Sequence, residues 1–146
     1  MTSPVRAVVD ASTIAKWVLD DEDLREGALA LLDDFLRYGR LELAAPALAW
    51  YELTALLTRA ERRQRASTSQ VNLALAYLLE LGMTVHEPQP VPALATARML
   101  GISGYDAAYV ALAADLGLDL WTADRRLVAA SVGLGFVRWI GDYSSA

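Results

Sequence analysis

The chain has 146 residues, of which 55% are hydrophobic and 21% are charged, and its formal net charge is -5 at pH 7. A chain of this length buries roughly 70% of the surface that its unfolded form exposes, so we expect one domain spanning residues 1–146. The absence of cysteine excludes disulfides, thiolate zinc sites and a cysteine nucleophile. No run reaches the about 18 apolar residues of a membrane span and no signal peptide is evident, so we expect a soluble, cytoplasmic protein with no membrane partner.

Short apolar runs alternate with helical spacings along the chain. In order, they predict a strand over 5–9, helices over about 12–19 and 24–38, a strand over 41–45, helices over 46–65 and 67–81, a strand over 83–87, helices over 93–101 and 106–117, a strand over 118–123, a helix over 124–131 and a strand over 135–140. Pro46 is expected to start its helix, because proline fits a first helical turn. Pro88, Pro90 and Pro92 are expected to form a rigid turn before the next helix. Strands separated by helices imply an α/β fold whose parallel sheet is covered on both faces.

Four carboxylates occupy distinctive positions in this pattern. They are Asp10, Glu52, Asp106 and Asp124. Asp10 and Asp124 directly follow predicted strands, and in open α/β sheets sites form at the carboxyl ends of the strands. These two could instead be helix N-caps, and Asp106 could complete a capping pattern with Ser103. The sequence leaves a structural and a functional role open for all three aspartates.

Glu52 lacks such a structural explanation. It interrupts a helical face that is otherwise apolar up to Arg59, and burying an ionised carboxylate without a partner is costly. Several acids in one place would raise one another's pKa unless a cation neutralised them. Mg²⁺ or Mn²⁺ would serve, because these hard ions prefer oxygen ligands. Zinc is disfavoured, because the single histidine, His86, is expected to be an ordinary half-buried or exposed residue at a strand end.

Four segments carry a family resemblance: VVDASTIAKW, P-x-L-x-x-YELTALL, GYDAAYVALA and LWTADRRL, each containing one of the four acids. Over nearly its whole length the chain resembles PIN-domain ribonucleases of the VapC toxin type. The resemblance implies a three-layer α/β/α sandwich around a central parallel sheet of about five strands. It also implies that the four acids bind one or two Mg²⁺ or Mn²⁺ ions and that a metal-bound water attacks an RNA phosphodiester.

The resemblance further implies particular roles and partners. Asp10, Asp106 and Asp124 are expected to coordinate metal, and Glu52 to coordinate metal or to position the water. The chain would be the toxin of a toxin–antitoxin pair that inhibits growth or translation, with RNA as substrate. A cognate antitoxin protein and a second copy of the chain, in a homodimer, would be its partners.

Four further residues are candidates for contact with the substrate phosphates: Ser12, Lys16, Thr122 and Arg125. Ser12, and less strongly Thr122, could offer a hydroxyl near a helix N-terminus, although a capping role is equally open for Ser12. Lys16 could contact phosphate, but a solvated side chain paired with Asp20 is favoured. Arg125 follows Asp124 directly, and arginine binds phosphate bidentately, with ordinary surface charge as the alternative.

The net charge of -5 is only weak evidence against an RNA substrate. Four of the acids would be confined to a metal pocket, and without them the formal charge would be -1. Two alternatives within the same family stay open: a PIN nuclease in RNA processing or decay without an antitoxin, and a non-catalytic binding PIN fold. A phosphoacceptor receiver domain is disfavoured, because that mechanism expects a lysine after a late strand and the only lysine here is Lys16.

Overall fold

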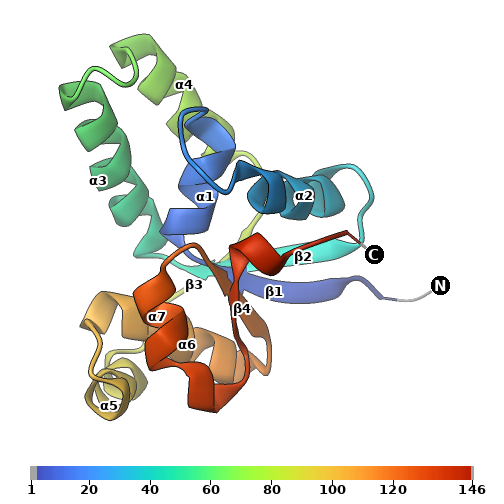
Figure 1. The fold of residues 1–146 in the computed structure, drawn as a ribbon, viewed down its shortest axis with the longest axis vertical. Helices are drawn as coiled ribbons and strands as arrows, with labels where there is room; N and C mark the ends of the chain where they lie inside the picture. The colour runs from blue at the N-terminus through green and yellow to red at the C-terminus, as the bar shows by residue number, and fades with distance from the viewer. Residues whose placement is uncertain (1–2, 146) are drawn as a thin grey trace.

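The computed structural model describes residues 3–145, and it alternates strands and helices as the sequence predicts (Figure 1). The strands are β1 (Val5–Val9), β2 (Leu41–Pro46), β3 (Thr84–His86), β4 (Asp119–Thr122) and β5 (Val137–Trp139). The α-helices are α1 (Ala11–Val18), α2 (Arg25–Leu36), α3 (Ala49–Arg62), α4 (Thr68–Leu79), α5 (Pro90–Leu100), α6 (Gly104–Leu116) and α7 (Arg125–Ala130). Two short 3-10 helices, η1 (Val132–Leu134) and η2 (Ile140–Asp142), flank β5.

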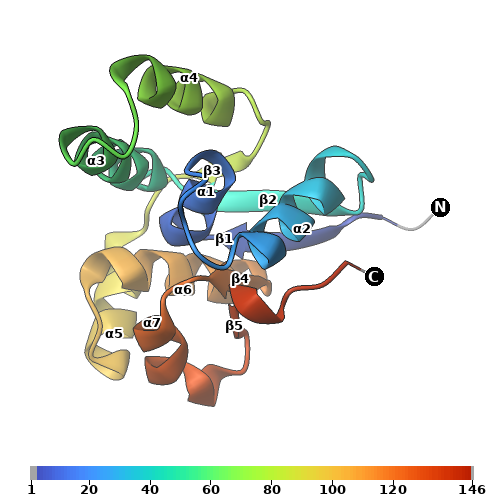
Figure 2. The same ribbon diagram turned by 45° about the horizontal axis from the view of Figure 1, so that its top comes forward.

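The five strands form one parallel sheet in the order β3-β2-β1-β4-β5. Helices α1 to α4 cover one face and α5 to α7 cover the other, as Figures 1 and 2 show. The predicted three-layer α/β/α sandwich is therefore confirmed. The strand order reverses direction at β1, which has β2 on one side and β4 on the other. In sheets of this kind, the crevice outside the carboxyl ends of two such strands is where ligands bind.

The core lies on both faces of the sheet. Val8 and Val9 are adjacent in β1 and point to opposite faces, and each has no exposed surface. Val9 packs in a cluster with Ile14 of α1, whereas Val8 packs in a second cluster with Tyr109 of α6. This double burial explains why the last three residues of β1, Ala7 to Val9, are all apolar up to Asp10, whereas Arg6 lies in the exposed first part of the strand.

Two predicted helix starts are wrong, and both involve proline. Pro46 is the last residue of β2 and pairs with His86, and α3 begins only at Ala49. The strand end tolerates proline because the next N–H, that of Ala47, donates to the His86 carbonyl at 2.8 Å. Conversely, α5 begins at Pro90 and not after the prolines, because the first helical turn needs no N–H donor.

His86 ends β3 and is half-buried, as predicted. Across residues 3–145, none of the helices combines the length and the apolar character that crossing a membrane would require.

Candidate active site

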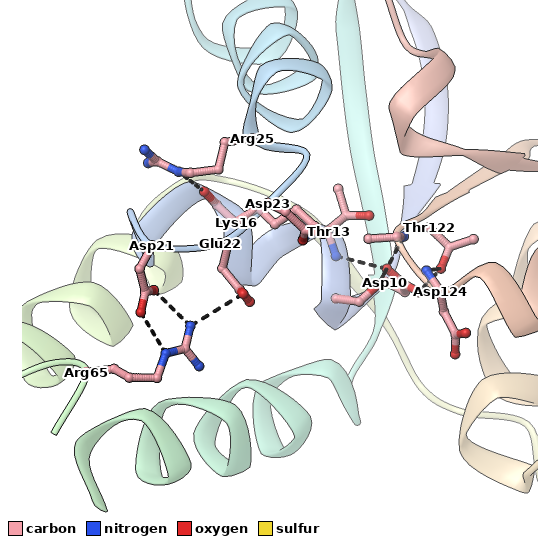
Figure 3. Close-up of polar contacts among 12 residues, drawn as sticks. Asp10, Thr13, Lys16, Asp21, Glu22, Asp23, Arg25, Arg65, Thr122 and Asp124 are labelled. Atoms are coloured by element: carbon pink, nitrogen blue, oxygen red, sulfur yellow. Dashed lines mark hydrogen bonds and ion pairs between the residues drawn. The ribbon is translucent and has the colours of Figure 1, made fainter. Parts of the chain in front are cut away.

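Asp10 lies at the carboxyl end of β1 and is only 6% exposed. Its Oδ1 caps α1 by accepting a hydrogen bond from the Thr13 backbone N–H at 3.1 Å, and it also accepts one from the Ser12 hydroxyl at 2.7 Å. Its Oδ2 accepts a hydrogen bond from the Thr122 hydroxyl at the end of β4 (Figure 3). The predicted N-cap is confirmed, and three donors fix the orientation of this carboxylate.

Ser12 and Thr122 connect Asp10 to the segment that carries Asp124. The Ser12 hydroxyl accepts a hydrogen bond from the Ala123 N–H at 3.1 Å, and the Thr122 hydroxyl accepts one from the Asp124 N–H at 3.0 Å. Thr122 has no exposed surface, so the structure does not support its predicted phosphate contact. Thr122 instead orients the acids by donating a hydrogen bond to Asp10 and accepting one from the Asp124 backbone. Ser12 lines the pocket described below, and its phosphate contact stays a prediction.

Asp124 and Asp106 lie at the starts of α7 and α6. The Oδ1 atom of Asp124 accepts hydrogen bonds from the N–H groups of Arg126 at 2.9 Å and Leu127 at 3.4 Å, which confirms its predicted capping role. The Ser103 hydroxyl caps α6 by accepting a hydrogen bond from the Asp106 N–H at 3.1 Å. These contacts leave the Asp106 carboxylate available to the pocket.

Glu52 reaches the same place from the first turn of α3. It is half-buried, and its Oε1 has no hydrogen-bond partner among the described residues. The Tyr109 hydroxyl of α6 lies close enough to oppose the rise in the Glu52 pKa, yet Tyr109 Oη also lacks a well-formed hydrogen bond within this part of the chain. Buried polar atoms without partners are rare and costly. Their presence here is not explained by the requirements of folding.

All four acids line one pocket of about 270 Å³ at the carboxyl edge of the sheet. The lining residues are Asp10, Ala11, Ser12, Glu52, Ala55, Leu56, Arg59, Asp106, Tyr109 and Asp124. We call this the acid pocket. A larger hollow of about 420 Å³ lies between α1, α3 and α4, but Asp20 is the one acid in its lining. The convergence of acids, and not the size of the hollow, therefore identifies the candidate site.

Burial raises the pKa of three of the pocket acids. For Asp10 burial is the main cause, and the hydrogen bond from Thr122 partly opposes it. For Glu52 burial is again the largest cause, and the nearby carboxylates of Asp10 and Asp106 raise the pKa further. For Asp106 burial comes first and the charge of Asp124 second. The acids therefore disfavour one another's ionised forms, as carboxylates do when they share a site.

No group of three or more histidine, cysteine, aspartate or glutamate side chains within residues 3–145 is arranged so that it could hold a metal ion in this conformation. The donor chemistry nevertheless fits a hard divalent cation, because the pocket offers carboxylate oxygens that repel one another. The partnerless Oε1 of Glu52 also fits this role. The residues that could hold such an ion after side-chain adjustment are Asp10, Glu52, Asp106 and Asp124.

Besides Thr122, two more predicted phosphate contacts, Lys16 and Arg125, lie outside the lining of the acid pocket. Lys16 is 5% exposed and its Nζ pairs with Asp23 at 3.1 Å, so the expected solvated side chain paired with Asp20 is wrong (Figure 3). The loop after α1 turns back and brings Asp23 to this lysine. Arg125 is exposed, and its guanidinium lies over the Trp139 ring, 4.3 Å from the centroid. Phosphate contact stays a prediction for Lys16 and Arg125.

Tyr109 and Arg59 line the pocket, but neither was a predicted site residue. Tyr109 follows Asp106 by three positions, and Arg59 follows Glu52 by seven, so each shares a helical face with a pocket acid. That spacing is the signal that could have identified them.

Comparison with known proteins assigns the chain to a family. The PIN domain matches residues 7–132. Ribonuclease VapC3 of Pyrobaculum aerophilum is 34% identical over 127 residues, which cover 84% of this chain and 92% of that protein. Ribonuclease VapC3 of Mycobacterium tuberculosis is 32% identical over 127 residues, which cover 87% of this chain and 88% of that protein.

Two solved structures share the architecture. The crystal structure of PAE2754 from Pyrobaculum aerophilum has a TM-score of 0.68 at 28% identity and covers 94% of this chain and 92% of its own. VapC20 of Mycobacterium tuberculosis, described as a sarcin-ricin loop cleaving toxin, has a TM-score of 0.63 at 19% identity and covers 90% of this chain and 96% of its own. The second likeness concerns the fold alone. The chain thus belongs to the PIN domain family and is of the VapC type, which confirms the resemblance seen in its motifs.

Proposed function

We propose that this chain is an endoribonuclease that depends on Mg²⁺ or Mn²⁺ and acts as the toxin of a toxin–antitoxin pair. The observation that carries the proposal is the convergence of four acids on one pocket beside the reversal point of the sheet. Relatives named as ribonucleases, similar over most of both chains, support RNA as the substrate.

Asp10, Asp106 and Asp124 would hold one or two divalent ions, with Glu52 as a further ligand or as the group that positions the water. When bound, such an ion lowers the pKa of a water molecule and offsets the charge that develops on the phosphate oxygens. It would also neutralise the mutual repulsion of the acids.

The chain's own residues orient the site. Thr122 and Ser12 hold the two oxygens of Asp10 in fixed directions, so this carboxylate needs little reorganisation before the reaction. Glu52 Oε1, which has no partner among the described residues, is available to accept a hydrogen bond from the attacking water. Ala55 and Leu56 form an apolar wall that strengthens electrostatic interactions inside the pocket.

Cleavage of RNA tests this proposal directly. The purified chain should cut RNA in the presence of Mg²⁺ or Mn²⁺, stop when EDTA is added and resume when metal is restored. Asp10→Asn should reduce cleavage by at least about a hundredfold, the loss expected when one electrostatic group of a catalytic site is removed. Circular dichroism should show an unchanged fold. Undiminished cleavage in EDTA, or by the Asn variant, would contradict metal-dependent catalysis.

The toxin role adds a cognate antitoxin protein and a homodimer as proposed partners. Apolar surface is available for such contacts on α5, where Val91 is 81% exposed, Leu94 61% and Met99 64%. Induced expression should arrest growth through RNA cleavage, and coexpression of the antitoxin should restore growth. Cleavage without growth arrest would favour a nuclease of RNA processing or decay. Growth arrest by Asp10→Asn would favour a non-catalytic PIN fold.

A further inference from the structure

Arg59 is the one cationic side chain in the lining of the acid pocket. It lies on α3, is exposed, and shares a helical face with the pocket residues Glu52, Ala55 and Leu56. Its guanidinium has no hydrogen bond or ion pair to any residue in the range 3–145. A positive charge therefore borders a pocket of four acids without being paired to any of them.

The sequence of α3 offers this arginine no local counter-charge. Ala55 and Leu56 occupy the positions four and three residues before it, and Arg62 and Arg63 occupy those three and four residues after it. Side chains at these spacings are neighbours on a helix, and like charges there are destabilising. Arg59 lies in the last turn of α3, where a positive charge favours the helix dipole, but no ion pair within the helix accounts for its position at the pocket.

Several other cations are occupied elsewhere. Arg65 binds Asp21 through Nε at 2.7 Å and Nη2 at 2.8 Å, and Arg138 binds Asp119 at 2.7 Å. The two cations predicted from the sequence to contact phosphate, Lys16 and Arg125, are held by Asp23 and by the Trp139 ring. Arg125 keeps its N–H donors but does not line the acid pocket, so among these cations Arg59 alone combines the position at the pocket with donors that are unpaired within residues 3–145.

We infer that Arg59 binds a phosphate of the RNA strand that enters the acid pocket, an inference that rests on the proposed nuclease function. A guanidinium presents parallel N–H donors that match two phosphate oxygens, and this bidentate contact gives orientation as well as affinity. Arg59 lies seven positions after Glu52 on α3, a rise of about 10 Å along the helix axis. The contact is accordingly to a phosphate beside the scissile one, so Arg59 aligns the strand and takes no part in the bond cleavage.

The test compares variants for RNA binding and for its dependence on salt. A fluorescent single-stranded RNA is titrated with the full chain carrying Asp10→Asn, which prevents cleavage, and fluorescence anisotropy is read between about 50 and 200 mM salt. Arg59→Ala is added to this background, and Arg98→Ala serves as the matched control. Arg98 is an exposed arginine in the last turn of α5 and lies outside the pocket lining, so its removal changes the net charge equally.

We expect Arg59→Ala to weaken RNA binding about tenfold or more and to reduce the slope of log K against log salt by about 0.7, the value for one phosphate contact on a single strand. Arg98→Ala should leave the slope unchanged, and Arg59→Lys should restore the slope but only part of the affinity. In the catalytically intact chain, Arg59→Ala should raise KM with kcat nearly unchanged.

Equal effects of Arg59→Ala and Arg98→Ala, or a large fall in kcat at constant KM, would overturn the inference. Thermal unfolding of Arg59→Ala should stay close to that of the parent, because the side chain is exposed and has no partner within residues 3–145, and such surface substitutions change stability little. If the intact chain bound RNA but did not cleave it, the proposed nuclease function would fail. The RNA affinities of the Arg59→Ala and Arg98→Ala variants would still show whether Arg59 binds RNA. Absence of RNA binding at low salt would overturn both.

Discussion

The loop between α1 and α2 and the acid pocket both gather carboxylates, and the structure treats the two groups differently. In the loop, Arg65 contacts Asp21 and Glu22, and Lys16 contacts Asp23 (Figure 3). These contacts lower the pKa of the Asp21 and Asp23 carboxyls, with the hydrogen bond from the basic partner as the largest cause in each case. The fold alone accounts for this acid cluster.

Within residues 3–145, no lysine or arginine forms an ion pair with a pocket acid. Three of them have a raised pKa, because burial and neighbouring carboxylates oppose their ionised forms. Glu52 Oε1 has no hydrogen-bond partner among the residues described, and Arg59, the cation on the wall, is unpaired there. The comparison teaches that acids in this chain are neutralised where they serve structure and left uncompensated where a ligand would supply the missing charge.

Removing the hydroxyl of Thr122 should have the largest effect. Thr122→Val leaves Asp10 Oδ2 without its donor and the Asp124 N–H without its acceptor, in a fully buried place. We expect a loss of about 1 to 3 kcal/mol in the free energy of unfolding and a fall of about tenfold to a hundredfold in RNA cleavage. Urea unfolding and cleavage rates measure the two effects.

Thr54→Val is the matched control for that change. The Thr54 hydroxyl donates to the Trp50 carbonyl at 2.8 Å on the exposed side of α3, so its loss should leave cleavage unchanged. Equal losses of activity in the two valine variants would show that Thr122 has no special role in positioning Asp10.

Neutralising Glu52 should change the free energy of unfolding less than Thr122→Val does, and should raise it instead of lowering it. Its pKa is raised in the folded chain, so the ionised form present at neutral pH destabilises the fold when no metal is bound. In EDTA at pH 7, Glu52→Gln should stabilise the chain by roughly 0.5 to 1 kcal/mol, a modest gain because the side chain is only half-buried. The gain should shrink as the pH falls through the raised pKa, where Glu52 becomes protonated in the parent. Destabilisation at pH 7 would show that the Glu52 carboxylate is compensated after all.

Arg65→Ala should have the smallest effect on stability. It should lower the stability at neutral pH, where Glu52→Gln raises it, and the effect should disappear in acid. The pKa of Asp21 is lowered from its ordinary value of 3.8, so its pairing with Arg65 stabilises the fold above that pH and ceases to do so as the pH falls through the lower folded-state value. A slight fall in Tm at pH 7 should vanish in acid, as followed by circular dichroism. Because the pair is exposed, high salt should also reduce the difference. A Tm difference that persisted in acid would exclude the ion pair as its cause.

Much of the fold and the four acids could be predicted, because they depend on local patterns. The apolar run of β1 and the Asp10 cap require only a few neighbouring residues. From the sequence, helix capping and a role in the site were alternatives for these aspartates. In the structure, Asp10 and Asp124 each cap a helix and also line the acid pocket. One carboxylate can cap a helix with one oxygen while its second oxygen, or a second lone pair, faces a pocket.

The errors arose where contacts distant in sequence decide the outcome. Helical spacing suggested Asp20 as the partner of Lys16, but a loop that turns back supplies Asp23. The spacing of Thr122 from Asp124 did not reveal that Thr122 is fully buried behind Asp10, because burial depends on how β1 and β4 pair. Likewise, the sequence shows a cluster of arginines after Glu52, and only the packing of α3 against α1 identifies Arg59 as the one at the pocket.

Calorimetric titration with Mn²⁺ tests most directly whether the uncompensated pocket acids form a metal site. The parent chain should bind the ion, and Asp10→Asn, Glu52→Gln, Asp106→Asn and Asp124→Asn should each weaken binding by about tenfold or more. Asp21→Asn, from the loop where acids are already paired, should bind as the parent does. Unchanged affinity in the four pocket variants, or an equal loss in Asp21→Asn, would contradict the assignment of the acid pocket as the metal site.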